Sequence, residues 1–79
     1  MSRYYFHVLN GHTLLDDEGT ELADLQAVRA EAVRASREII LTHEGNAEFW
    51  AGEPARLWIT DGPNATGRTV LTIEMSARA

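Results

Sequence analysis

The stretch Tyr4-Tyr5-Phe6-His7-Val8-Leu9-Asn10-Gly11 decides the fold that this sequence predicts. Aromatic and β-branched residues favour an extended strand, and Asn-Gly after such a strand is the strongest short-range signal for a β-hairpin. A two-residue type I′ turn needs positive φ at both central residues, which Asn and Gly tolerate best. We therefore expect a hairpin whose loop is Asn10-Gly11, with Leu9 opposite His12 and the earlier residues paired in the same register.

Both faces of the expected hairpin are apolar or aromatic. Side chains alternate across a strand, and in this register one face carries Tyr4, Phe6, Val8, Thr13 and Leu15. The other face carries Tyr5, His7, Leu9, His12 and Leu14. A hairpin that packs on one side only would have a polar second face. The second face of this hairpin is therefore expected to contact something other than the core of its own chain.

One long amphipathic helix is expected after the hairpin. Its apolar residues recur at three- and four-residue spacing: Leu25, Val28, Ala32, Ala35 and Ile39. The helix is expected to span Leu25 to about His43, with Asp24 as N-cap and Gly45 as its C-terminal stop. The segment 46–55 after it forms either one further helical turn, containing Phe49-Trp50, or a loop.

A second hairpin is expected from the segments 56–60 and 69–75, in which Leu57 and Ile59 share one face of the first strand. The order of elements is then ββαββ. It predicts an α+β fold, with an antiparallel sheet of about four strands and the helix packed on one face. Residues 1–79 are expected to form a single domain.

Composition excludes several classes of protein. The net charge is −5 and all seven basic residues are arginines, interspersed with acidic ones, so no basic stripe for nucleic acid or anionic membranes is expected. The chain has no cysteine, which excludes disulfides and cysteine-ligated zinc. It has neither a signal-peptide pattern nor an apolar run of about 18 residues, so a cytoplasmic protein without a cofactor is expected.

His7, His12 and Asp16 form the best candidate metal site. In the expected register His12 and Asp16 are both diagonal neighbours of His7, at about 7–8 Å between backbones. Imidazole and carboxylate ligands suit Zn²⁺ and other divalent ions. Two histidines and a turn aspartate also share a sheet face by chance in many proteins. A metal-binding protein or a metal-dependent enzyme is therefore an alternative function.

Other catalytic patterns are weak. The segment Gly62–Thr69 follows the phosphate-loop spacing G-x-x-x-x-G-K-[ST] with arginine in place of lysine. That loop must lead into a helix, whereas the residues after Gly67-Arg68 alternate as a strand does, so we expect an ordinary hairpin connection. With no cysteine, and with no serine in a nucleophile elbow, the chain is not expected to be an enzyme.

The second sheet face is the expected interaction surface. If the two hairpins share one sheet, five side chains cluster on the face opposite the helix: Tyr5, His7, Leu9, Trp58 and Val70. Large amphipathic rings of this kind more often fill a core or an interface than stack a ligand. We therefore expect a non-catalytic interaction module that forms a homodimer or binds a small protein partner through this face.

Four segments resemble a known family, the bacterial domain of unknown function DUF6894: Arg3–His7, Asp17–Leu22, Asp24–Ala32 and Gly67-Arg68. The resemblance implies a small stand-alone α+β protein and brings no activity with it. The arrangement of strands before an alanine-rich helix is similar, more weakly, to antitoxins of the HicB kind, which implies binding to a small toxin as a further alternative. The chain lacks their usual turn ahead of the helix, and it is not expected to carry a DNA-binding tail.

Overall fold

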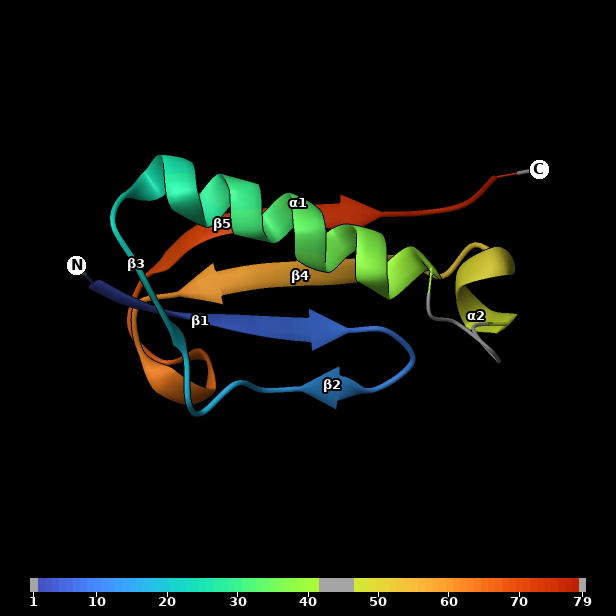
Figure 1. The fold of residues 1–79 in the computed structure, drawn as a ribbon. Coiled ribbons are helices and arrows are strands. Elements are labelled where there is room, and N and C mark those ends of the chain that lie inside the picture. The colour runs from blue at the N-terminus through green and yellow to red at the C-terminus, as the bar shows by residue number, and fades with distance from the viewer. Residues whose placement is uncertain (1, 42–46, 79) are drawn as a thin grey trace.

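The structure, a computed structural model, describes residues 2–41 and 47–78 and is α+β. Its elements in chain order are β1 (Ser2–Leu9), β2 (Thr13–Leu14), β3 (Thr20–Leu22), α1 (Leu25–Leu41), α2 (Ala47–Trp50), β4 (Ala55–Thr60), the short 3₁₀ helix η1 (Pro63–Ala65) and β5 (Thr69–Met75). Helix α1 crosses one face of the sheet (Figure 1). The expected fold class is confirmed, with a five-stranded sheet because β3 adds to the four strands that were predicted.

Strand β1 organises the sheet. The strand order is β2-β1-β4-β5, all neighbours are antiparallel, and β3 pairs with the first residues of β1. The two hairpins therefore join through β1 and β4, whose register places Phe6 opposite Ile59 and His7 opposite Trp58. Because opposite residues share a face, Tyr4, Phe6 and Val8 lie on the helix side, as expected from the sequence.

The core lies between α1 and β4. Val28 and Ala32 of the helix and Leu57 and Ile59 of the strand are all 0% exposed. Full burial of a side chain such as Leu57 contributes about 1.5–3 kcal/mol, so this small cluster supplies much of the stability of a short chain. Partly buried residues surround it: Tyr4, Phe6, Val8, Leu22, Ala35, Ile39, Val70, Leu71 and Ile73.

The helix begins where the sequence predicts. The Asp24 carboxylate accepts a hydrogen bond from the Ala27 N–H at 2.9 Å, which confirms the N-cap. The expected end near His43 and the Gly45 stop lie outside the described residues. Beyond them, α2 shows that the Phe49-Trp50 pair lies on a helical turn, which settles the alternative left open by the sequence.

The register of the first hairpin differs from the prediction by one residue. Leu9 pairs with Thr13 and Val8 with Leu14, so the loop has three residues. Gly11 has a φ of 80°, and Asn10 is not among the described residues with positive φ, so the two-residue type I′ turn does not form. The Asn10 N–H donates instead to the His12 carbonyl at 3.1 Å. Leu14 therefore moves to the helix side, and His12 lies in the loop.

The position of Val70 also differs from the prediction. Ile59 pairs with Leu71 and Thr60 with Thr69, so Val70 is the extra residue of a β-bulge in β5. Val70 packs against the core cluster on the helix side. It therefore does not join Tyr5 and Trp58 on the opposite face, because the bulge changes the alternation of side chains at this point.

Candidate functional site

His7 lies at the centre of a hydrogen-bonded network on the face opposite α1. It is 0% exposed, and its ring lies 5.3 Å from the ring of Trp58, the residue opposite it on β4. Nδ1 accepts a hydrogen bond from the Asp16 backbone N–H at 3.0 Å, and Nε2 lies 2.8 Å from the Thr60 hydroxyl oxygen. The Thr60 hydroxyl in turn donates to the Gly62 carbonyl at 2.7 Å. Since Nδ1 accepts, the proton of the neutral ring is on Nε2.

Asp16 holds this network together, because each of its polar atoms has a partner. Its Oδ2 accepts from the Phe6 N–H at 3.0 Å, and its Oδ1 accepts from the N–H groups of Glu18 and Gly19, both at 3.1 Å. Its carbonyl accepts from the Asn64 N–H at 2.9 Å, and its own N–H donates to the His7 ring. One residue thus joins β1, the turn before β3 and the β4–β5 connection.

The Asp16 carboxylate takes the place of a strand partner. Phe6 lies between the residues of β1 that pair with β3, up to Tyr4, and those that pair with β2, from Val8 onward. A backbone N–H without a partner in such a gap costs free energy, and the carboxylate removes that cost. Asp16 was predicted as a possible metal ligand. Its spacing to Gly19 is the sequence signal for the role it has, an aspartate that closes its own turn.

Burial sets the protonation states of this network. It lowers the pKa of His7 below the ordinary value of 6.5, and the nearby Asp16 carboxylate offsets only part of that effect. Burial by itself raises the pKa of Asp16, but the N–H donors of Gly19, Phe6 and Glu18 outweigh it, so the pKa is lowered. A neutral imidazole and an ionised carboxylate are therefore the states that fit the fold.

The network does not have the form of a catalytic triad. Thr60 is only 1% exposed, so its hydroxyl does not meet a substrate. His7 carries its proton on the nitrogen that faces Thr60, and a general base would need that nitrogen free. The contacts fit a structural role, in which a buried polar network closes one end of the sheet.

The residues of the predicted metal site do not converge. Both ring nitrogens of His7 and both carboxylate oxygens of Asp16 have hydrogen-bond partners within the chain, while His12 is exposed in the β1–β2 loop. Over residues 2–41 and 47–78 no group of three histidine, aspartate or glutamate side chains is placed to hold a metal ion.

The sheet face opposite α1 has a covered end and an open end. At the covered end the turn at Gly19 lies against Tyr5, since a Cβ at this glycine would come within 2.8 Å of the tyrosine ring. His7 is buried beside it, so neither His7 nor Val70 belongs to the open surface predicted from the sequence. The open end is formed by Leu9, Arg56, Trp58, Thr72 and Glu74, which we call the Trp58 patch.

Trp58 is held in place within the patch. The His7 ring lies against it at 5.3 Å, tilted by 44°, and the Arg56 guanidinium carbon lies 5.5 Å from its ring centre. Both contacts come from its own sheet, from the opposite residue and from the residue two positions earlier. Glu74 is directly opposite Arg56 on β5 and balances its charge within the patch.

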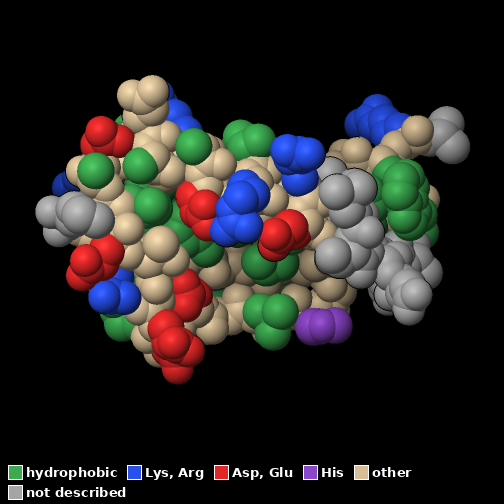
Figure 2. Space-filling view, in the orientation of Figure 1, with side chains coloured by type: hydrophobic (Ala, Val, Ile, Leu, Met, Phe, Trp, Pro, Cys, Tyr) green, Lys and Arg blue, Asp and Glu red, His purple; other side chains and the backbone are tan. Residues whose placement is uncertain are grey.

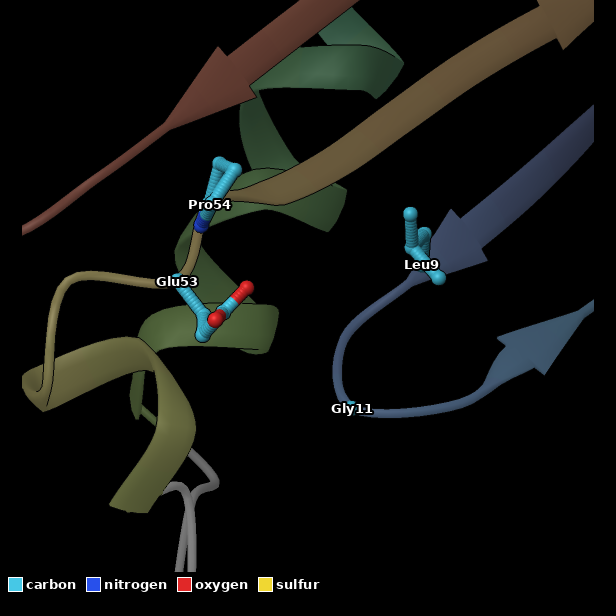
Figure 3. A pocket seen from close by; sticks show the side chains of 4 residues that line it. All are labelled: Leu9, Gly11, Glu53 and Pro54. Carbon is cyan, nitrogen blue, oxygen red and sulfur yellow. The ribbon is translucent and has the colours of Figure 1, made fainter.

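A hollow of ≈ 260 Å³ adjoins this end of the sheet. It is lined by Leu9, Gly11, Glu53 and Pro54, between the β1–β2 loop and the connection from α2 to β4. Figure 3 shows the Glu53 carboxylate extending into the space that faces Leu9. Leu9 belongs both to the hollow and to the Trp58 patch, so the two surfaces are continuous.

A family model described as a domain of unknown function, DUF6894, matches residues 3–76. The chain belongs to this family. The resemblance noted in the sequence is thereby confirmed. No curated protein and no solved structure matches the chain. The geometry of this member of DUF6894 is therefore what indicates its function.

Two further observations concern membrane spanning and surface charge. None of the helices in the described part of the chain has the length and hydropathy needed to cross a membrane. Figure 2 shows acidic and basic side chains interspersed over the α1 side of this DUF6894 domain, with no continuous basic area on the visible face.

Proposed function

We propose that this chain is a small cytoplasmic interaction module without catalysis of its own. It binds a protein partner through the Trp58 patch. The observation that carries the proposal is the placement of Trp58, which is half-buried on a sheet face without a helix layer and packed between His7 and Arg56. The absence of cysteine agrees with a reducing compartment.

The composition and order of the patch support binding to a protein. Tryptophan, tyrosine and arginine are enriched among the residues that carry most of the free energy of protein–protein binding. Such side chains normally lose conformational entropy when a complex forms. A side chain that its own fold already holds in place loses less entropy, so binding costs less free energy. Leu9 and the hollow beside it extend the apolar surface, and Glu74 provides a polar rim.

The partner is either a second copy or a different protein. His7 is buried and Val70 packs on the helix side, so the surface available for pairing two sheets face to face is smaller than the sequence predicted. A smaller apolar surface favours a partner that brings its own complementary pocket for Trp58. No group of three metal-ligating side chains among the described residues favours the metal-dependent enzyme.

The test uses the two tryptophans of the chain as a matched pair. Trp50 is 67% exposed on α2, so Trp50→Ala removes an exposed ring outside the patch. A partner isolated with the wild-type chain and then purified is titrated against wild type, Trp58→Ala and Trp50→Ala. We expect Trp58→Ala to lose at least tenfold in affinity and Trp50→Ala to lose less than twofold. Equal affinities of the two variants would overturn the proposal.

Trp58→Ala must be shown to remain folded, because the Trp58 ring also covers His7. Arg56→Gln provides a second variant, since Arg56 is exposed and its removal leaves the core unchanged. A loss of affinity in both patch variants, with far-UV circular dichroism equal to wild type, supports the proposal. A partner that binds both variants as tightly as wild type contradicts it.

A further inference from the structure

Strand β5 is a free edge of the described sheet and has little of the usual protection. It is the last strand in the order β2-β1-β4-β5, and no strand of the described residues lies beyond it. Natural edges are protected by proline, by lysine or by bulges. The seven residues Thr69–Met75 contain neither proline nor lysine, and the only charged one, Glu74, faces Arg56 on the neighbouring strand. The bulge at Val70 disturbs only the start of the strand, which leaves Leu71–Met75 regular.

The apolar side chains of β5 are only partly covered by the rest of the chain. Leu57 and Ile59 of β4 are fully buried under α1, whereas Leu71, Ile73 and Met75 of β5 face the same side and are only half-buried. Helix and neighbouring strand thus cover the apolar edge residues on one side only. An added strand would cover the other side, because directly opposite side chains in a sheet pack against each other.

We infer that two copies of this chain pair antiparallel through their β5 strands and form one continuous sheet. Such pairing has a twofold axis perpendicular to the sheet, so both α1 helices lie on one side and both Trp58 patches on the other. Opposite residues in a sheet share a face, so one residue of β5 must lie opposite its own copy. The twofold axis passes midway between these two copies.

The sequence of the edge selects Ile73 as the residue on the axis. That register pairs the whole regular segment, with Leu71 opposite Met75 on the helix side and Thr72 opposite Glu74 on the other. An axis at Glu74 would oppose two carboxylates, and an axis at Thr72 would oppose Glu74 to the bulged Val70. With Ile73 on the axis, every apolar residue of the segment meets an apolar one.

The expected dimer is weak and salt-dependent. Pairing of one short edge falls at the low end of interface size, below about 1,200 Å², where weak and transient complexes are found. Each chain carries a net charge of −5, so the copies repel each other at low ionic strength. Added salt screens that repulsion and is expected to strengthen association.

The absence of cysteine makes the register directly testable. Single-cysteine variants are oxidised mildly at high micromolar concentration, and disulfide-linked dimers are followed on non-reducing gels. Ile73→Cys places two thiols on the axis, with Cα atoms about 5 Å apart, within the ~7 Å limit for a disulfide. Thr69→Cys places them about 27 Å apart at ~3.4 Å per residue. We expect cross-linking to be at least tenfold faster for Ile73→Cys than for Thr69→Cys or for the exposed Trp50→Cys.

A second pair of variants avoids the half-buried position. Thr72 and Glu74 are both exposed, so we expect Thr72→Cys and Glu74→Cys to fold as the wild type does. A mixture of the two variants is expected to cross-link faster than either alone. A Trp58→Cys variant samples the open sheet face in the same assay. Equal rates in all variants, or fastest cross-linking of Trp58→Cys, would overturn the edge pairing. This inference is independent of the proposed partner binding, since partner affinity lost in Trp58→Ala without any cross-link at β5 would support that function alone.

Discussion

Replacement of His7 by phenylalanine tests whether the buried network stabilises the fold. His7→Phe keeps a ring of similar size but leaves the Asp16 N–H without an acceptor. The Thr60 hydroxyl still donates its hydrogen bond to the Gly62 carbonyl. A buried donor without a partner costs about 1–3 kcal/mol. At ~0.05–0.15 kcal/mol per residue the whole chain has about 4–12 kcal/mol of stability. A loss of about 2 kcal/mol would lower the Tm by about 8–16 °C.

The same variant has a distinct dependence on pH. The pKa of His7 is lowered by burial in the folded state, so the unfolded chain binds the proton more readily. The contribution of His7 to stability is therefore complete above pH 6.5 and is lost as the pH falls below that value toward the folded-state pKa. The slope reaches at most about 1.4 kcal/mol per pH unit for one proton. His7→Phe should lack this part of the acid sensitivity.

Urea unfolding followed by circular dichroism, between about pH 7.5 and 5.5, measures both effects. His12→Gln is the matched control, because His12 is exposed in the β1–β2 loop whereas His7 is buried. Wild type should lose stability across this range and His7→Phe should not. If both lose stability in parallel, or if wild type gains stability on acidification, the reasoning about His7 is refuted.

Further predictions concern the same end of the sheet. Asp16→Asn has the same shape but turns an NH₂ group toward backbone donors, so we expect urea unfolding to report a loss of about 1–3 kcal/mol; an unchanged midpoint would contradict it. Gly19→Ala should lower the Tm more than Gly52→Ala, since both glycines have positive φ but a methyl group at position 19 would stand only 2.7 Å from the Arg3 side chain; equal Tm values would contradict it. Stoichiometric zinc should leave the His7 ring resonances unshifted in NMR spectra, because both ring nitrogens are engaged; a shift would revive a metal site.

The elements predicted correctly are those fixed by neighbours in sequence. The Asp24 cap needs only the backbone N–H three residues later, and α1 needs only its own apolar spacing. The second hairpin follows from alternation within each strand. Strand β3 was missed because its three residues pair with the start of β1, and nothing within the segment itself indicates that partner.

The errors arise where distant segments decide the local conformation. The Asn10-Gly11 signal identified the hairpin but not the loop length, which depends on whether Asn10 adopts positive φ. Alternation placed His7 correctly on the second face, yet no pattern within β1 reveals that the Asp16 segment and the β4–β5 connection close over that position. The open part of the face was therefore predicted too large.

The hydrogen bond between His7 and Thr60 joins residues 53 positions apart in the chain. Closing so long a loop costs conformational entropy before the contact contributes any stability. We therefore expect this hydrogen bond to form after the main folding barrier. An interaction that is absent from the transition state acts on the rate of unfolding and not on the rate of folding. Stopped-flow measurements should therefore show that mild acid shortens the lifetime of the folded chain while leaving its refolding rate nearly unchanged.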